Sequence, residues 1–356
     1  MPTLFDPVQL GSLHMPNRIV MAPLTRLRAG APAHVPNRLM AEYYAQRADA
    51  GLIISEGVPV SPQAVGYLNV PGVWTAEQLA GWRLVTHAVH AAGGRIFMQI
   101  WHVGRISDPA HLRGDLPVAP SPLQAPGHVS LLRPQRPFVV PRSLGLEEIP
   151  GVIEAFRSAA QNAKAAGFDG VTIHGANGYL LDQFLQDGTN QRTDAYGGSV
   201  ERRARLMLEV TDAVVSVWGA DRVGMHLATR SPSHGVSDSH PEITFPYVAA
   251  ELGKRKLAFL FVRETRGPGA LLGKLKSAFG GAVIANDGFD LAAATEAVTH
   301  GGIEAVAFGR DYISNPDLVQ RLRIGAPLNP LVAETIYDPL STLGAQGYTD
   351  YPVLAS

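Results

Sequence analysis

The chain has 356 residues, of which 46% are hydrophobic and 17% are charged, so it can bury a large core. Its formal net charge of -1 provides no field that would attract nucleic acid or an anionic membrane surface, and neither partner is expected. The absence of cysteine excludes structural disulfides, cysteine-ligated zinc or iron–sulfur clusters, and a thiol nucleophile.

The beginning of the chain, Met-Pro-Thr-Leu-Phe-Asp-Pro, has no basic region followed by an apolar one. No run of about 18 apolar residues occurs anywhere in the sequence. We therefore expect a cytoplasmic protein with no membrane-spanning segment.

Short apolar runs alternate with amphipathic patterns along the chain. The runs predicted as strands are 18–21, 51–55, 95–100, 170–173, 223–227, 258–262, 282–285 and 305–308. The helical patterns cover 36–48, 75–92, 146–166, 199–217, 241–254, 271–279, 291–300 and 315–322. Eight strand–helix units match a (β/α)8 TIM barrel better than a doubly wound sheet, which usually has fewer strands. Residues 1–356 are predicted to form one such domain, with an N-terminal cap.

Two segments show little periodicity. Residues 104–143, after the third predicted strand, are rich in proline and polar residues. A loop that long in a compact barrel is usually a functional element, so we predict a lid-like insertion. Residues 331–356 are predicted to form a C-terminal loop segment.

The stretch His-Gly-Ala-Asn-Gly-Tyr follows the predicted strand 170–173 directly. His174 and Asn177 can hydrogen-bond an anionic or carbonyl group, and Tyr179 can give up a proton. Each residue alone could equally be a packing residue at a strand end. The three together, with two intervening glycines that let a ligand approach the backbone, indicate an active site.

Other predicted strand ends carry matching signals. Gln99 and Trp101 point the same way by period-two alternation, and an amide beside a wide aromatic wall suits a planar heterocycle. Residues 286–288 and 309–311 follow strands seven and eight, where TIM barrels often bind phosphate. The alternatives are a packing role for Trp101 and an ordinary salt bridge for Arg310.

Taken together, these motifs resemble the Old Yellow Enzyme family of FMN-dependent ene-reductases over nearly the full length of the chain. A xenobiotic-reductase or N-ethylmaleimide-reductase subgroup is one possibility. The segments that carry the resemblance are 4–7, 17–26, 99–105, 174–185, 190–199, 201–203, 307–311 and 347–352.

The resemblance implies a bound FMN that NADPH or NADH reduces. His174 and Asn177 would hold the substrate's carbonyl or nitro oxygens, and Tyr179 would donate the proton. The positions implied to contact FMN are Pro23, Leu24, Thr25, Gly57 (after the second strand), Gln99, His226, Asn286, Asp287, Gly288, Gly309 and Arg310. Tyr67, Trp101 and Tyr337 would line the substrate pocket.

One position departs from the family pattern. Most members place an arginine on strand five near flavin N1 and O2, whereas this chain has His226. A histidine supplies a cation only when it is protonated. Arg230, four residues further on, could compensate, or His226 could serve as a neutral hydrogen-bond donor.

The implied reaction is the NAD(P)H-dependent reduction of the C=C bond of small activated alkenes such as enones, maleimides and nitroalkenes, and of nitroesters or nitroaromatics. The alternative is a non-catalytic or metal-dependent TIM-barrel protein that binds a phosphorylated ligand. No metal is expected, because the histidines show neither a short His-x-His spacing nor a paired carboxylate.

Overall fold

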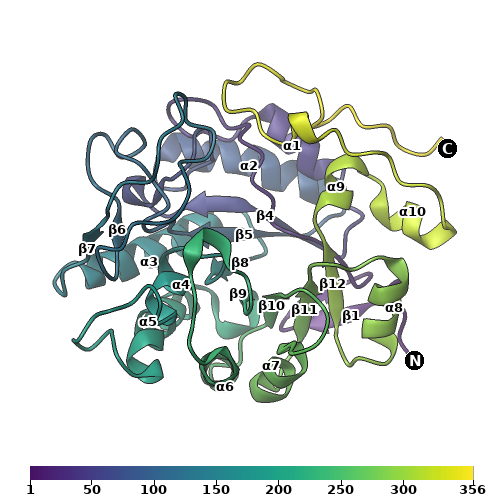
Figure 1. Ribbon diagram of the computed structural model, residues 1–356. Helices are drawn as coiled ribbons and strands as arrows, with labels where there is room; N and C mark the ends of the chain where they lie inside the picture. The colour runs from purple at the N-terminus through teal and green to yellow at the C-terminus, as the bar shows by residue number, and fades with distance from the viewer. Residues whose placement is uncertain (356) are drawn as a thin grey trace.

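The computed structural model describes residues 1–355 and contains a closed barrel of eight parallel strands (Figure 1). The barrel strands are β3 (Ile19–Met21), β4 (Leu52–Pro59), β5 (Ile96–Trp101), β8 (Gly170–His174), β9 (Val223–Ala228), β10 (Phe259–Arg263), β11 (Val283–Asn286) and β12 (Ala305–Phe308). Each predicted strand is present, and the (β/α)8 TIM-barrel fold is confirmed.

Helices surround the strands, and the C-terminal segment, yellow in Figure 1, passes over α1. The helices are α1 (Arg38–Ala45), α2 (Ala76–Ala91), α3 (Ile149–Ala165), α4 (Leu180–Leu185), α5 (Val200–Trp218), α6 (Pro241–Lys254), α7 (Leu272–Phe279), α8 (Leu291–Thr299), α9 (Arg310–Ser314) and α10 (Leu318–Ile324). Short 3-10 turns are η1 (Pro62–Ala64), η2 (Ala220–Arg222), η3 (Ser233–Gly235) and η4 (Ala333–Thr335). Within residues 1–355, each helix is too short or too polar to span a bilayer.

The helix predicted at 315–322 is wrong in its boundaries. The structure has α9 ending at Ser314 and α10 beginning at Leu318. Asn315 precedes Pro316 and adopts φ -128° and ψ 90°, because a proline disfavours the helical conformation of the residue before it. The prediction also lacks α4, because six residues are too few to show a helical period.

Strand β4 continues four residues beyond the predicted end at 55. Its register with β5 shifts between Ile54 and Gly57, as at a β-bulge, and pairing then continues to Pro59. Gly57 therefore lies inside the strand and not after it, contrary to the prediction. The bulge aligns Gly57 with Gln99 of β5.

Glycines and large aromatic residues alternate around the barrel interior near the amino ends of the strands. A Cβ added at Gly170 would lie 2.3 Å from the Phe97 ring, and one added at Gly224 would lie 2.3 Å from the Phe259 ring. The glycines thus leave room for the two phenylalanines, as close packing requires. The hairpin of β1 (Val8–Leu10) and β2 (Leu13–Met15) packs against the same cluster. The hairpin covers the amino end of the barrel, whereas the predicted site residues lie towards the carboxyl ends of the strands.

Residues 104–143 form an irregular segment beside the barrel mouth. Its pairing joins β6 (Val118–Ala119) to β7 (Arg142–Ser143), the latter at the end of the segment, and an isolated antiparallel bridge joins His128 to Pro137. Val129 and Phe138 are buried in one cluster with Trp101 and Tyr179. The segment therefore packs directly on residues of the predicted active site.

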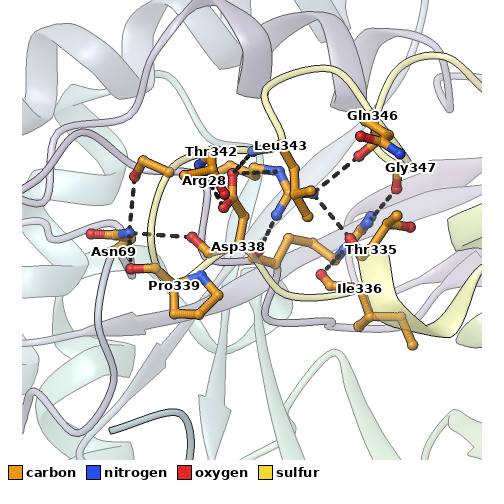
Figure 2. A network of polar contacts seen from close by, with 12 residues as sticks. Arg28, Asn69, Thr335, Ile336, Asp338, Pro339, Thr342, Leu343, Gln346 and Gly347 are labelled. Carbon is orange, nitrogen blue, oxygen red and sulfur yellow. Dashed lines mark hydrogen bonds and ion pairs between the residues drawn. The ribbon is translucent and has the colours of Figure 1, made fainter. Parts of the chain in front are cut away.

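The C-terminal segment is tied to the barrel by a polar network, shown in Figure 2. The Arg28 guanidinium donates to the carbonyl oxygen of Thr335 at 3.0 Å and lies 3.9 Å from the Asp338 carboxylate. Asn69 Nδ2 donates to the carbonyl oxygens of Asp338 and Pro339. Tyr337 directly precedes Asp338 in the chain, so this network holds Tyr337 at the barrel mouth.

Candidate active site

A continuous cluster of aromatic rings lies at the carboxyl ends of β5, β8 and β9. The Tyr179 ring centroid is 4.7 Å from that of Trp101 and 5.0 Å from that of His174. His174 in turn lies 4.8 Å from His226, and Trp101 stacks on Tyr67 at 5.7 Å. The fold therefore brings together predicted site residues that come from four different segments.

The loop after β8 is held in an uncommon backbone conformation. Asn177 has φ 56° and Gly178 has φ 75°, in the left-handed region that favours glycine. Gly178 N–H donates to Asp182 at 2.8 Å, and His234 Nδ1 lies 2.8 Å from the Asn177 carbonyl oxygen. A Cβ at Gly178 would come within 2.5 Å of the Ser233 carbonyl oxygen, so this position requires glycine. These contacts fix the position of Asn177.

His174 is a neutral hydrogen-bond donor. Its Nδ1 accepts a hydrogen bond from Ala176 N–H at 3.3 Å, so the proton of the neutral ring is on Nε2. Burial, followed by the charges of Arg263 and His234, lowers the pKa of His174 to about 3. The side chain can therefore donate from Nε2 without becoming charged at neutral pH.

Tyr179 and Tyr67 form a phenol pair. Their hydroxyl oxygens lie 2.9 Å apart. Burial raises the pKa of Tyr179 well above its usual value of 10.0, and burial raises the pKa of Tyr67 to about 12. Both phenols stay protonated at neutral pH, so Tyr179 meets the first requirement of a general acid.

His226 does not supply a cation. The Gln99 amide nitrogen lies 3.1 Å from His226 Nδ1, and an amide nitrogen only donates, so Nδ1 accepts and the ring proton is on Nε2. Burial, with the nearby His174 and Arg263, lowers the pKa of His226 well below its usual value. Of the two alternatives for this position, the structure therefore favours a neutral donor.

Several buried polar atoms at the mouth have no partner among residues 1–355. They include Trp101 Nε1, Thr172 Oγ1 and His226 Nε2, and alternation along the strands turns all three inward. Leaving such groups unpaired costs roughly 1–3 kcal/mol each. Open donors at the base of a mouth fit the acceptor edge of an isoalloxazine, so these residues fit an FMN ring.

The neighbouring Trp101 side chain requires glycine at position 57. A Cβ at Gly57 would come within 2.7 Å of the Trp101 ring. The glycine therefore lets the indole lie across β4, and Trp101 is then the surface that a planar ligand would meet.

The two predicted phosphate segments lie side by side, because β11 pairs with β12. Asn286 Nδ2 donates to the Ala307 carbonyl oxygen at 2.9 Å, and the Asp287 carboxylate lies 3.3 Å from Arg263 Nε, so protein partners occupy both side chains. Gly288 has φ 72° with open space around it. The groups that remain for an anion are backbone N–H groups, since α9 begins at Arg310 and the first N–H groups of a helix have no internal acceptor.

Arg310 itself is exposed, and no hydrogen bond or ion pair to its guanidinium occurs within residues 1–355. Pro23, Leu24 and Thr25 follow β3 and lie next to this region, because Leu24 is 3.6 Å from a Cβ built at Gly309. An exposed guanidinium beside a glycine-rich strand end fits a phosphate. The salt-bridge alternative for Arg310 has no partner here.

A cavity of about 480 Å³ opens over the phenol pair. Thr25, Tyr67, Tyr179 and Tyr337 line it, and the irregular segment 104–143 contributes His128, Ser130, Leu131, Arg133 and Gln135. A larger cavity of about 1050 Å³ lies on the other side of Tyr67, but it contains no other predicted site residue. The smaller cavity is therefore the one that leads to the site.

Two residues at the mouth are missing from the sequence-based prediction. His234 follows β9 and lies 5.2 Å from the Tyr179 ring, but a loop position gives no pattern from which to predict it. Arg263 ends β10 and contacts Asn177. Period-two alternation with Phe259 and Phe261 could have identified Arg263 as inward-facing. Among residues 1–355, no group of three His, Asp or Glu side chains is placed to hold a metal ion.

Comparisons with known proteins agree with this geometry. Residues 3–329 match the model of the NADH:flavin oxidoreductase / NADH oxidase family. A probable flavin mononucleotide-dependent alkene reductase of Leishmania infantum is 40% identical, covering 99% of this chain and 97% of its own. Morphinone reductase in complex with tetrahydroNAD is 48% identical with a TM-score of 0.95, covering 100% of this chain and 98% of that chain.

A third relative, the old yellow enzyme homologue of Zymomonas mobilis, is 43% identical with a TM-score of 0.95, covering 99% of this chain and 100% of that chain. The fold, the open donors at the mouth and the match over almost the whole chain lead to one conclusion. The chain belongs to the NADH:flavin oxidoreductase / NADH oxidase family and is an FMN-dependent, NAD(P)H-dependent oxidoreductase of the Old Yellow Enzyme type.

Proposed function

We propose that this enzyme reduces the C=C bond of small activated alkenes, including enones, maleimides and nitroalkenes, and also accepts nitroesters or nitroaromatics. The observation that carries the proposal is the grouping of two neutral donors, His174 and Asn177, beside a protonated Tyr179 in one mouth. The names of the relatives, an alkene reductase and morphinone reductase, support the same chemistry.

When bound, FMN would take hydride from the reduced nicotinamide and pass it to the alkene. The protein supplies orientation and electrostatics. His174 Nε2 and Asn177 Nδ2 donate to the oxygen of the electron-withdrawing group, which stabilises negative charge there as the alkene is reduced. Tyr179 then gives its proton to the alkene carbon that bears the electron-withdrawing group. Trp101 and Tyr67 form the wall that excludes water.

Different residues would hold the ring and the phosphate of FMN. Gln99 and His226 would hold the polar edge of the ring, and Pro23, Leu24 and Thr25 would contact the ring. Gly288, Gly309 and Arg310 would bind the phosphate, whereas Asn286 and Asp287 shape that loop through their protein contacts. Segment 104–143 acts as a lid, since Arg133 and His128 line the entrance. The cytoplasmic location and the single domain of residues 1–356 stay predictions.

The proposal is tested with the purified holoenzyme. We expect a yellow protein that is bleached anaerobically by NADPH or NADH and is reoxidised by cyclohexenone, N-ethylmaleimide or a nitroalkene. Product analysis should show a saturated C–C bond. A colourless protein that cannot take up FMN, or a reduced enzyme that none of these acceptors reoxidises, would contradict the proposal.

The pH dependence of the alkene step is a further prediction. The pKa of His174 is lowered to about 3 and that of Tyr179 is raised above 10.0, so both groups stay neutral from about pH 5 to about pH 9. We expect the rate at which pre-reduced enzyme reacts with an enone, followed by stopped-flow absorbance, to be flat over this range. An inflection near pH 6.5 that disappears in His174→Asn would show that His174 titrates and would contradict the assignment.

A further inference from the structure

The site lacks a cation on β9. His226 accepts a hydrogen bond from Gln99 on Nδ1 and is therefore neutral. Arg230 does not replace it, because its guanidinium donates to Glu264 at 3.0 Å and to the carbonyl oxygens of Thr265 and Pro268. Glu264 is buried and neutralises Arg230 in the outer loop.

Arg263 lies at the carboxyl end of β10, next to β9. Phe259 and Phe261 on the same strand are in the barrel interior, so alternation turns Arg263 into the mouth. Its Nη1 donates to Asn177 Oδ1 at 2.9 Å, and its Nε lies 3.3 Å from the Asp287 carboxylate. The side chains of Arg263 and Asp287 are 38% and 40% exposed, so solvent screens this ion pair. The positive charge of Arg263 still reaches the buried part of the site, where, in addition to burial, it contributes to lowering the pKa of His174 and of His226.

The contact with Asn177 determines which end of the amide faces a ligand. A guanidinium has only donors, so the amide must turn Oδ1 towards Arg263. Nδ2 is then directed away from Arg263 and is free to donate. Without Arg263, the amide could rotate by about 180° at no cost and present an oxygen to the substrate's oxygen, which would repel it.

We propose that Arg263 is the positioning residue of this site: it orients the Asn177 amide as a donor and supplies, from β10, the positive charge that β9 does not provide. This inference rests on the proposed function. The role of Arg263 follows from the neutral state of His226.

The orientation role is tested by a double-mutant cycle with the oxidised holoenzyme. The variants are Arg263→Met, Asn177→Ala and the double variant, and the measurement is the dissociation constant of cyclohexanone, a ketone that cannot be reduced at a C=C bond, from its effect on the flavin spectrum. We expect Arg263→Met to weaken binding by about tenfold in the parent and by less than about twofold in Asn177→Ala. Equal weakening in both backgrounds, or none in the parent, would overturn the orientation role.

The charge role is tested by the midpoint potential of the bound flavin. Arg263→Met should shift the equilibrium between reduced and oxidised flavin about tenfold towards the oxidised form, which lowers a two-electron potential by about 30 mV. Arg263→Lys keeps the charge but not the planar fork, so it should restore the potential while cyclohexanone binding stays weak. If both variants keep the parent potential, Arg263 is not the cation of the site.

Arg266→Met is the matched control. Arg266 is three residues away, is exposed, and its guanidinium lies over the Phe289 ring. It should leave cyclohexanone affinity and flavin potential unchanged. If Arg263→Met does not retain FMN, Arg263→Lys decides the orientation role, because it must weaken cyclohexanone binding only when Asn177 is present. Neither readout needs turnover, so a failure to reduce alkenes would contradict the proposed function without changing these results.

Discussion

Tyr179→Phe is expected to slow the reduction of enones by about 10²–10⁴-fold while the reduction of the bound flavin by NAD(P)H stays close to normal. The physical reason is that phenylalanine keeps the ring that packs against Trp101 and His174 but removes the proton that the product carbon needs. Each half-reaction is followed by stopped-flow absorbance of the flavin, the first with a reduced nicotinamide and the second with pre-reduced enzyme and cyclohexenone.

Tyr67→Phe is the matched control for this prediction. It removes the hydroxyl that lies 2.9 Å from the Tyr179 hydroxyl but leaves the proton of Tyr179 in place. Its effect on the alkene step should therefore not exceed about tenfold, the value of one hydrogen bond of about 1.4 kcal/mol. Equal loss of both half-reactions in Tyr179→Phe would mean that Tyr179 holds the site together and does not donate a proton.

Arg47→Met is expected to lower the free energy of unfolding by about 4 kcal/mol, which is exceptional for one substitution. Arg47 is fully buried just after α1, and its guanidinium donates to the carbonyl oxygens of Tyr43, Tyr312 and Ile313 at 2.7 to 2.9 Å. It also lies 3.8 Å from the Tyr43 ring centroid. Methionine would fill part of the volume but leave these buried oxygens without donors, at roughly 1–3 kcal/mol each.

The measurement is a urea unfolding curve, with Arg38→Met as the control. Arg38 is an exposed residue of α1 whose side chain makes no hydrogen bond to any residue in 1–355, so its replacement should change stability by no more than about 0.5 kcal/mol. Because Tyr312 lies on α9, which follows Gly309 and begins at Arg310, we also expect Arg47→Met to release FMN faster. A loss below about 1 kcal/mol in Arg47→Met would show that water or neighbouring groups satisfy the exposed carbonyls.

Much of the fold was predictable from local patterns, and the errors have local physical causes. Each barrel strand gave a short apolar run, because strands buried on both faces contain few polar residues. The pattern at 315–322 failed where Pro316 breaks the helix, and β4 was predicted too short because a bulge at Gly57 has no signature in composition. The position of His174 at the end of β8 and of Tyr179 in the loop that follows was predictable from the end of the apolar run, while their roles in the site stay predictions.

The charge and orientation of those groups were not predictable, because they depend on contacts between residues far apart in the chain. Gln99 sets the tautomer of His226 across 127 positions, and Arg263 orients Asn177 across 86. The sequence suggested Arg230 as a substitute cation from its nearness to His226, but the twist and alternation of the next strand place Arg263 there instead. The residue types and the ends of the strands are determined by the sequence alone, because both depend on local patterns. The direction in which the site residues donate hydrogen bonds and their pKa values depend on burial and on neighbours that come together only when the barrel has closed.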